Sequence, residues 1–293
     1  MPAPNQPPTI EHVCEKALRL PCSPALLPRL ADALQSDESS ALEIERLISL
    51  DSSLAVATLR LANSAAFGRG GIETLEGAIF RLGAKEIYRL AALVLISRWE
   101  LGAQTSLNRE PGDFSRHALC TAIAAEVLAD RTGRLEPQSA YTAGLVIDLG
   151  KLAMAHSGSA FYPAVQAMCV GKKCAWEQAE SAIFGYNHGD VSVRLLQAWK
   201  FPERFVAAAR YMLRPMEAPA EALPLLSHLH AGKYIAMSFG PGVSEDSFLT
   251  TLHGSFLQEW GFTAEIMEQA MPIVLERASA RLGEKLTQGV VSI

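Results

Sequence analysis

The chain has 293 residues, of which 49% are hydrophobic and 19% charged, so it can bury a core of its own and is not disordered as a whole. Its 26 Lys and Arg against 31 Asp and Glu give a formal charge of -5, which weakens attraction to nucleic-acid phosphates and anionic membranes. No apolar run reaches the roughly 18 residues of a membrane-spanning helix. Composition therefore predicts a soluble globular protein without a nucleic-acid or membrane partner.

The first residues carry no targeting signal. Residues 1–8 contain four prolines and no basic residue, so we expect residues 1–10 to form a flexible tail and the protein to be cytoplasmic. Five cysteines, an odd number without a Cys-x-x-Cys motif, argue against a disulfide framework, and we expect reduced core thiols. The spacing of Cys169 and Cys174 would place them on different faces of a helix, which argues against a redox pair.

Apolar residues recur at three- and four-residue intervals almost throughout, which predicts an all-α fold. In the first part of the chain, a capping box at Ser40–Glu43 begins a helix that ends near residue 50, and Asp51 caps the next helix, which runs to Asn63. A glycine-rich loop follows. Thr74 then caps a helix toward Gly83, and a further helix is expected at residues 84–99.

The helical pattern is interrupted between residues 100 and 112 by glycine, asparagine and proline, so we expect a boundary between a lobe at 11–105 and a second lobe at 106–293. The helices expected in the second lobe lie near residues 113–132, 137–156, 174–184, 190–199, 202–212, 220–239 and from 247 into the C-terminal region. The last is interrupted at 260–261, restarts at Thr263 and contains Pro272, which predicts a kink.

The common catalytic motifs are absent. The chain has no phosphate-binding loop, no Gly-x-Ser-x-Gly nucleophile elbow and no His-Glu-x-x-His. The glycine run at 68–71 lacks the third glycine of a dinucleotide-binding fingerprint and follows a helix, so it is interpreted as a turn.

The most informative segment is residues 140–152, AYTAGLVIDLGKL, with His117 before it and His188 after it. It resembles the core motif of the HD superfamily of metal-dependent phosphohydrolases, which usually reads Gly-Leu-Leu-His-Asp-Ile-Gly-Lys. Ile147 stands where that family has its metal-binding His, and Asp148 of the pair remains.

Four further segments, 47–68, 72–83, 180–188 and 195–202, resemble the HDOD (HD-related output domain) family, a degenerate branch of the HD superfamily found in bacterial signalling proteins. The Leu-Arg-Leu-Ala-Asn-Ser element at 59–64 is fairly specific to it. The resemblance covers about residues 20–245. It implies a multi-helical, two-lobed bundle with a degenerate HD-like lobe.

Carried over from the HD motif, His117, Asp148 and His188 are the metal positions that survive, whereas Ile147, Met212, Leu213 and Gly232 stand where active enzymes carry ligands. A catalytic metal needs about three protein ligands and an open position. We therefore expect no catalytic residue and no cofactor, with weak divalent-metal binding left open.

The surviving trio allows three interpretations. It is a hydrogen-bonded remnant, a site for a weakly held metal or a small ligand, or the catalytic site of a residual metal-dependent phosphohydrolase. Lys151 lies three positions after Asp148 on the same helix face and is expected to neutralise it. The candidates for a ligand or partner pocket are His117, Asp148, Lys151 and His188.

Two other groups are weaker candidates. His228 and His230 would diverge by about 200° on a helix, so they are not expected to form a ligand pair. Arg81, Lys85 and Arg89 recur at four-residue spacing and predict a positive, solvated helix face. Because no helix-turn-helix signature is evident, an acidic protein fits this face better than DNA.

The HDOD resemblance implies a non-catalytic regulatory module, of the kind that serves as a response-regulator output in signal transduction. Such a module acts through protein partners, for example a sensor kinase, a receiver domain or another signalling protein. The alternatives are a residual metal-dependent HD-type phosphohydrolase and a nucleotide-sensing pocket without hydrolysis. The oligomeric state is not predicted.

Overall fold

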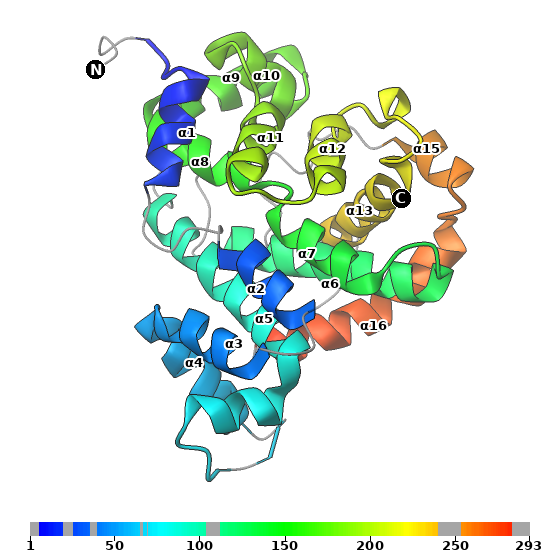
Figure 1. Ribbon diagram of the computed structural model, residues 1–293. Helices are drawn as coiled ribbons and strands as arrows, with labels where there is room; N and C mark the ends of the chain where they lie inside the picture. The colour runs from blue at the N-terminus through cyan, green and yellow to red at the C-terminus, as the bar shows by residue number, and fades with distance from the viewer. Residues whose placement is uncertain are drawn as a thin grey trace. The chain divides into compact units, whose positions relative to one another are not determined.

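The computed structural model describes residues 6–19, 26–35, 40–64, 67–68, 70–103, 112–239 and 253–282. Within these ranges every regular element is helical, which confirms the all-α prediction (Figure 1). None of the described helices is both long enough and apolar enough to cross a bilayer. The chain divides into two compact units, one of residues 20–98 and one of residues 1–19 together with 99–293.

The smaller unit contains α2 (Leu26–Gln35), α3 (Ser40–Ser49), α4 (Ser52–Ala62) and most of α5 (Leu75–Ala103). The caps predicted at Asp51 and Thr74 are confirmed, because Asp51 Oδ1 accepts from the Leu54 N–H at 3.0 Å and Thr74 Oγ1 from the Gly77 N–H at 3.1 Å. Helix α3 begins at Ser40, where the predicted capping box stays a prediction. Gly83, at φ 73° and ψ 160°, interrupts α5, so the two helices expected on either side of it are present.

Asn63 and Arg81 close the loop between α4 and α5. The Asn63 side-chain amide exchanges two hydrogen bonds with the backbone of Ile72, at 2.8 and 3.1 Å. A single Arg81 nitrogen donates to the carbonyls of Ala62, Gly68 and Gly70 at 3.0–3.2 Å. The Leu-Arg-Leu-Ala-Asn-Ser element therefore has a structural role.

The larger unit begins with α1 (Ile10–Leu18), which the expected boundary had grouped with the N-terminal lobe. This helix buries Val13 and Ala17 and packs on the helices that follow residue 148. Of the expected flexible tail, residues 1–5 lie outside the described residues. Pro8 is buried, and its carbonyl accepts from the Tyr186 hydroxyl at 2.6 Å.

The end of α5 also belongs to the larger unit. Trp99 is buried, packs edge-on against Trp199 at 5.2 Å between ring centroids, and its carbonyl lies 2.8 Å from His156 Nε2. The Glu100 carboxylate accepts from the backbone N–H groups of Phe114 and Ser115. These contacts explain why Trp99 and Glu100 belong to the larger unit.

The remaining elements of the larger unit are α6 (Asp113–Thr132), α7 (Pro137–Val146), α8 (Leu149–Gly158), η2 (Ser159–Phe161), α9 (Tyr162–Lys172), α10 (Trp176–Phe184), α11 (His188–Ala198), α12 (Glu203–Tyr211), η3 (Pro215–Glu217), α13 (Leu223–Ser238), α15 (Gly254–Glu259) and α16 (Ala264–Leu282). Two differences from the sequence expectation stand out. The single helix expected at 137–156 is two helices, α7 and α8, because Asp148 adopts a non-helical φ of -103° and ψ of 13°. Helix α9 was not predicted.

The C-terminal elements follow the expectation where they are described. Gly261, at φ 77°, breaks the chain between α15 and α16, and Thr263 Oγ1 accepts from the Ile266 N–H at 3.4 Å. Pro272 lies inside α16, where the kink stays a prediction. The first residues of the helix expected from 247 lie outside the described residues.

Helix α6 is the centre of the larger unit, with α7, α13 and α16 packed along it (Figure 1). Two glycines allow this close approach. A Cβ at Gly144 of α7 would lie 2.6 Å from Ala122 Cα, and one at Gly232 of α13 would lie 2.9 Å from the Thr121 carbonyl oxygen. The position where the HD family has its closing Asp is therefore a helix-packing glycine here.

Candidate functional site

The site lies where α8 begins, next to the start of α11. Asp148 is the N-cap residue of α8, and Gly150 follows in its first turn. The Gly150 N–H donates to Ser192 Oγ at 2.9 Å, and a Cβ at Gly150 would overlap the His188 carbonyl oxygen. This backbone-to-backbone contact holds Asp148 beside the α11 terminus that begins with His188.

Asp148 forms a buried ion pair with Lys233 of α13. Lys233 Nζ donates to Asp148 Oδ2 at 2.7 Å, and the two side chains are only 9% and 10% exposed. Burial by itself would raise the pKa of Asp148, but the charges of Lys233, Lys151 and His188 together lower that pKa well below its usual range. The carboxylate is therefore ionised and held by a lysine ammonium.

A second cation joins the one expected from the sequence. The charge of Lys151 contributes to the lowered pKa of Asp148, as expected from its place three residues on, and Lys233 adds a hydrogen bond to Oδ2. Sequence reasoning missed Lys233, although it directly follows Gly232, the residue at the family's closing-Asp position.

His188 is held by a second buried carboxylate, Glu180 of α10. Glu180 is fully buried; its Oε2 lies 2.6 Å from His188 Nδ1 and accepts from the His188 backbone N–H at 2.9 Å. Trp176 Nε1 donates to the other oxygen at 3.0 Å. Because a carboxylate only accepts, Nδ1 of His188 carries the proton in this pair. Metal-binding histidines are oriented in the same way, by a carboxylate that accepts from the ring nitrogen that does not bind the metal.

These residues do not fit a metal centre. Asp148 Oδ2 holds an ammonium, and Ile147 beside it is an apolar side chain only 3% exposed. His117 is buried in α6. Among the residues that the structure describes, no three His, Cys, Asp or Glu side chains gather as a metal-binding group, so His117, Asp148 and His188 are not brought together as ligands.

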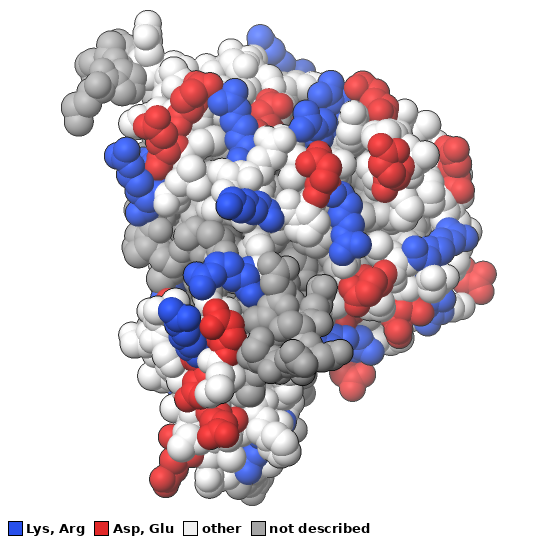
Figure 2. Space-filling model, viewed as in Figure 1, with Lys and Arg blue, Asp and Glu red and all other residues white. Residues whose placement is uncertain are grey.

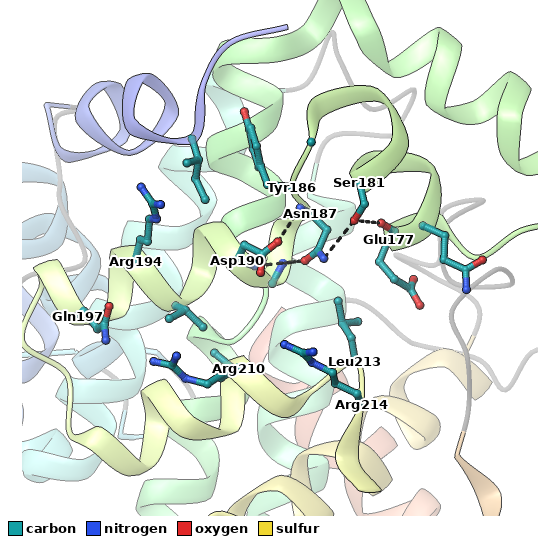
Figure 3. A pocket seen from close by; sticks show the side chains of 16 residues that line it. Glu177, Ser181, Tyr186, Asn187, Asp190, Arg194, Gln197, Arg210, Leu213 and Arg214 are labelled. Carbon is teal, nitrogen blue, oxygen red and sulfur yellow. Dashed lines mark hydrogen bonds between the residues drawn. The ribbon is translucent and has the colours of Figure 1, made fainter. Parts of the chain in front are cut away.

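The larger unit also contains an open cavity of about 1060 Å³ lined by α10, α11 and α12 and the residues that join or follow them (Figure 3). Its charged lining residues are Glu177, Asp190, Arg194, Arg210 and Arg214. None of the four pocket candidates expected from the sequence lines it. The arginines lie up to twenty positions apart in the chain, and only the packing of α11 against α12 brings them together.

The basic stripe of α5 is not the solvated face that its spacing predicted. Arg89 is only 8% exposed and pairs with Glu86 at 2.6 Å. Arg81 is committed to three backbone carbonyls, whereas Lys85 is exposed. The stripe therefore mainly stabilises the smaller unit.

His228 and His230 diverge, as their spacing predicted. The two nitrogens of His228 lie 2.6 Å from the Pro224 carbonyl and 2.8 Å from Thr132 Oγ1. His230 instead packs edge-on against Phe256. Burial, with the nearby charge of Lys233, lowers the pKa of His230 to about 3.

The four described cysteines, Cys14, Cys120, Cys169 and Cys174, are free thiols, and Cys22 lies outside the described residues. Cys169 and Cys174 do not sit on different faces of one helix, because α9 ends at Lys172 and Lys173 turns the chain at φ 50°. The Cys174 thiol donates to the Met168 carbonyl at 3.8 Å, and after burial the nearby Cys174 further raises the pKa of Cys169. The prediction that the two side chains lie on different faces of a helix is therefore wrong.

Known proteins resemble this chain in sequence and in fold. Residues 20–215 match the family model of the HDOD domain. An uncharacterized protein of Treponema pallidum (strain Nichols) is 24% identical over 210 residues, which is 71% of this chain, and the chain spans 40% of that relative's length.

Solved structures share the fold at low identity. An HDOD domain protein of unknown function from Geobacter sulfurreducens superposes with a TM-score of 0.69 at 20% identity, over 94% of this chain and 97% of the other. A Marinobacter aquaeolei protein provisionally named for signal transduction gives 0.71 at 20%, over 92% and 60%. A Shewanella amazonensis protein provisionally named a phosphohydrolase gives 0.66 at 22%, over 94% and 98%. With two thirds of its length matched by the family model, the chain belongs to the HDOD domain family.

Proposed function

We propose that the protein is a non-catalytic regulatory module of bacterial signal transduction that acts through a protein partner, such as a sensor kinase or a receiver domain. The observation that carries this proposal is the Asp148–Lys233 ion pair. Asp148 is the one residue of the HD pair that remains, and its carboxylate is occupied by a lysine at 2.7 Å.

A lysine ammonium cannot replace the metal that HD hydrolysis requires. It offers no open coordination position, and it does not turn a bound water into hydroxide near neutral pH. A divalent ion on the same carboxylate would face the positive charges of Lys233 and Lys151 at close range. The ion pair therefore supports the proposal that the protein keeps the HD fold but does not catalyse metal-dependent hydrolysis.

Two further observations support action through a partner. The chain belongs to the HDOD domain family. Its fold is similar to that of a Marinobacter aquaeolei protein whose name refers to signal transduction. The arginine-lined cavity offers a polar surface distinct from the Asp148 site. A regulatory module that catalyses no reaction passes on a signal by binding a partner, and the cavity provides a surface for such binding.

The test is a hydrolysis screen on the full chain, purified without chelator and supplied in turn with Mn²⁺, Fe²⁺ and Mg²⁺. Bis-p-nitrophenyl phosphate and cyclic dinucleotides serve as substrates. We expect no turnover above that of the Asp148→Ala variant. Metal-dependent turnover in the wild-type protein that Asp148→Ala abolishes, with helicity by circular dichroism unchanged, would contradict the proposal.

A further inference from the structure

The cavity between α10, α11 and α12 gathers arginines in a chain that is acidic overall. Arg194 comes from α11, Arg210 from α12 and Arg214 from the residues just after it, and all three line the cavity (Figure 3). The formal charge of the chain is -5. Figure 2 shows basic and acidic side chains interspersed on the surface over α11 and α12. In the cavity the three arginines outnumber the acidic residues Glu177 and Asp190, and they are the groups that can bind anions.

The arginines are available to a ligand. Arg194 pairs with Glu11 at 2.6 Å and Arg214 with Glu217 at 3.4 Å, but the four side chains are 46–63% exposed. Exposed pairs of this kind contribute little to stability, so a ligand carboxylate can replace them. Arg210 is exposed and forms no ion pair with the described residues.

The two acidic lining residues behave differently. Asp190 is committed to the α11 capping box, where its Oδ2 accepts from the Asn187 backbone N–H at 3.0 Å. Glu177 is only 9% exposed, and within the described part of the chain its Oε2 accepts no hydrogen bond. Glu177 belongs to the lining of the cavity, but its Oε2 is closed to solvent, so this oxygen does not face a ligand. The site therefore calls for anions at the arginines.

An extended acidic peptide carries several carboxylates along its length, which suits three arginines that come from α11, from α12 and from the residues just after it. A free phosphate presents a single anionic group. The volume of about 1060 Å³ also lies at the upper end of small-molecule pockets, which suits a segment of chain. We propose that this cavity binds an acidic peptide segment of the signalling partner. This inference rests on the proposed function, since it names the chemistry of that partner and where it docks.

The test selects peptide ligands from a random library, so the sequence of the ligand need not be known in advance. A phage library of random 16-residue peptides is panned on the immobilised full chain, and the enriched peptides are titrated by fluorescence anisotropy. We expect enrichment in Asp and Glu. The Arg210→Glu and Arg214→Glu double variant should raise their Kd at least tenfold, whereas Arg277→Glu, which reverses an exposed arginine of α16, should change it less than twofold.

Three outcomes overturn the inference: no enriched peptide, enriched peptides without acidic bias, or binding that the double variant leaves unchanged. ATP and inorganic phosphate are titrated in parallel. Binding of either that is lost in the double variant, without acidic peptides in the selection, would assign the cavity to a small anion instead. Phosphodiesterase activity alongside arginine-dependent peptide binding would contradict the proposed function and leave this inference standing.

Discussion

Lys233 Nζ donates to Asp148 Oδ2 across 85 positions of sequence, and it joins the last turns of α13 to the start of α8. The pair is buried, so each charge depends on the other. It places the remaining acid of the HD motif in a buried ion pair.

Removing the ammonium should destabilise the fold. Lys233→Met leaves the buried Asp148 carboxylate without its hydrogen-bond donor, and we expect the free energy of unfolding in urea to fall by about 3–5 kcal/mol. Adding Asp148→Asn to Lys233→Met should restore part of the loss, because the second substitution removes the unpaired charge. A loss below about 1 kcal/mol in the single variant would show that the ion pair is not formed.

The buried His230 should make the protein acid-sensitive. Its pKa is lowered in the folded state to about 3, so the unfolded chain binds the proton first. Stability is then complete above the ordinary histidine pKa and is lost as pH falls toward 3. Between pH 7 and pH 5 this group should reduce the free energy of unfolding by about 2 kcal/mol.

The measurement compares urea unfolding at pH 7 and pH 5 for the wild-type protein, His230→Leu and, as a control, His12→Gln at an exposed position. The difference between the two pH values should shrink in His230→Leu and persist in His12→Gln. Equal pH dependence in wild type and His230→Leu would count against a neutral, buried imidazole.

The contact of α8 with α11 gives a paired glycine test. A Cβ at Gly150 would meet the His188 carbonyl oxygen and would lie 2.8 Å from the Ser192 backbone nitrogen, so Gly150→Ala should lower the free energy of unfolding by about 3 kcal/mol. Gly171 in α9 has nothing within 4 Å of its Cβ position, so Gly171→Ala should raise it by up to about 1 kcal/mol. Thermal denaturation of both variants checks the pair, and a stable Gly150→Ala would exclude this backbone contact.

The buried thiols should resist alkylation. Burial raises the pKa of Cys120 and of Cys169 to about 12, with Cys174 adding to the effect at Cys169. At pH 8 a thiol of this pKa is ionised to roughly one part in 10⁴, so both should react with iodoacetamide at least a hundredfold more slowly in the native protein than in 6 M guanidinium. Mass spectrometry of the labelled peptides measures both rates. Equal rates at either cysteine in the two states would contradict its burial.

The sequence predicts what is local in this fold. Asp51, Thr74 and Thr263 cap helices where they were expected, because a capping side chain bonds to backbone only two or three residues away. The helix boundary at 147–148 was missed, since apolar residues continue across Asp148 and hide the change in its backbone angles.

The chemistry of the site depends on contacts that no local pattern encodes. Lys233 reaches Asp148, and Arg210 and Arg214 join Arg194, only after the helices have packed. The family resemblance pointed to Asp148 and His188, but it carried no information about the groups that hold them. Glu180 shares the matched segment 180–188 with His188, yet its burial is visible only in the structure.

The metal content of the purified protein shows whether Asp148 holds a metal ion. The full chain, freed of tags and prepared without chelator, is analysed for Fe, Mn, Zn, Ni and Mg beside the Asp148→Ala and Lys233→Met variants. With the carboxylate of Asp148 held by Lys233, we expect far less than one metal ion per chain in the wild-type protein. A near-stoichiometric transition metal that is lost in Asp148→Ala would show that Asp148 binds a metal ion and would return this site to metal-dependent chemistry.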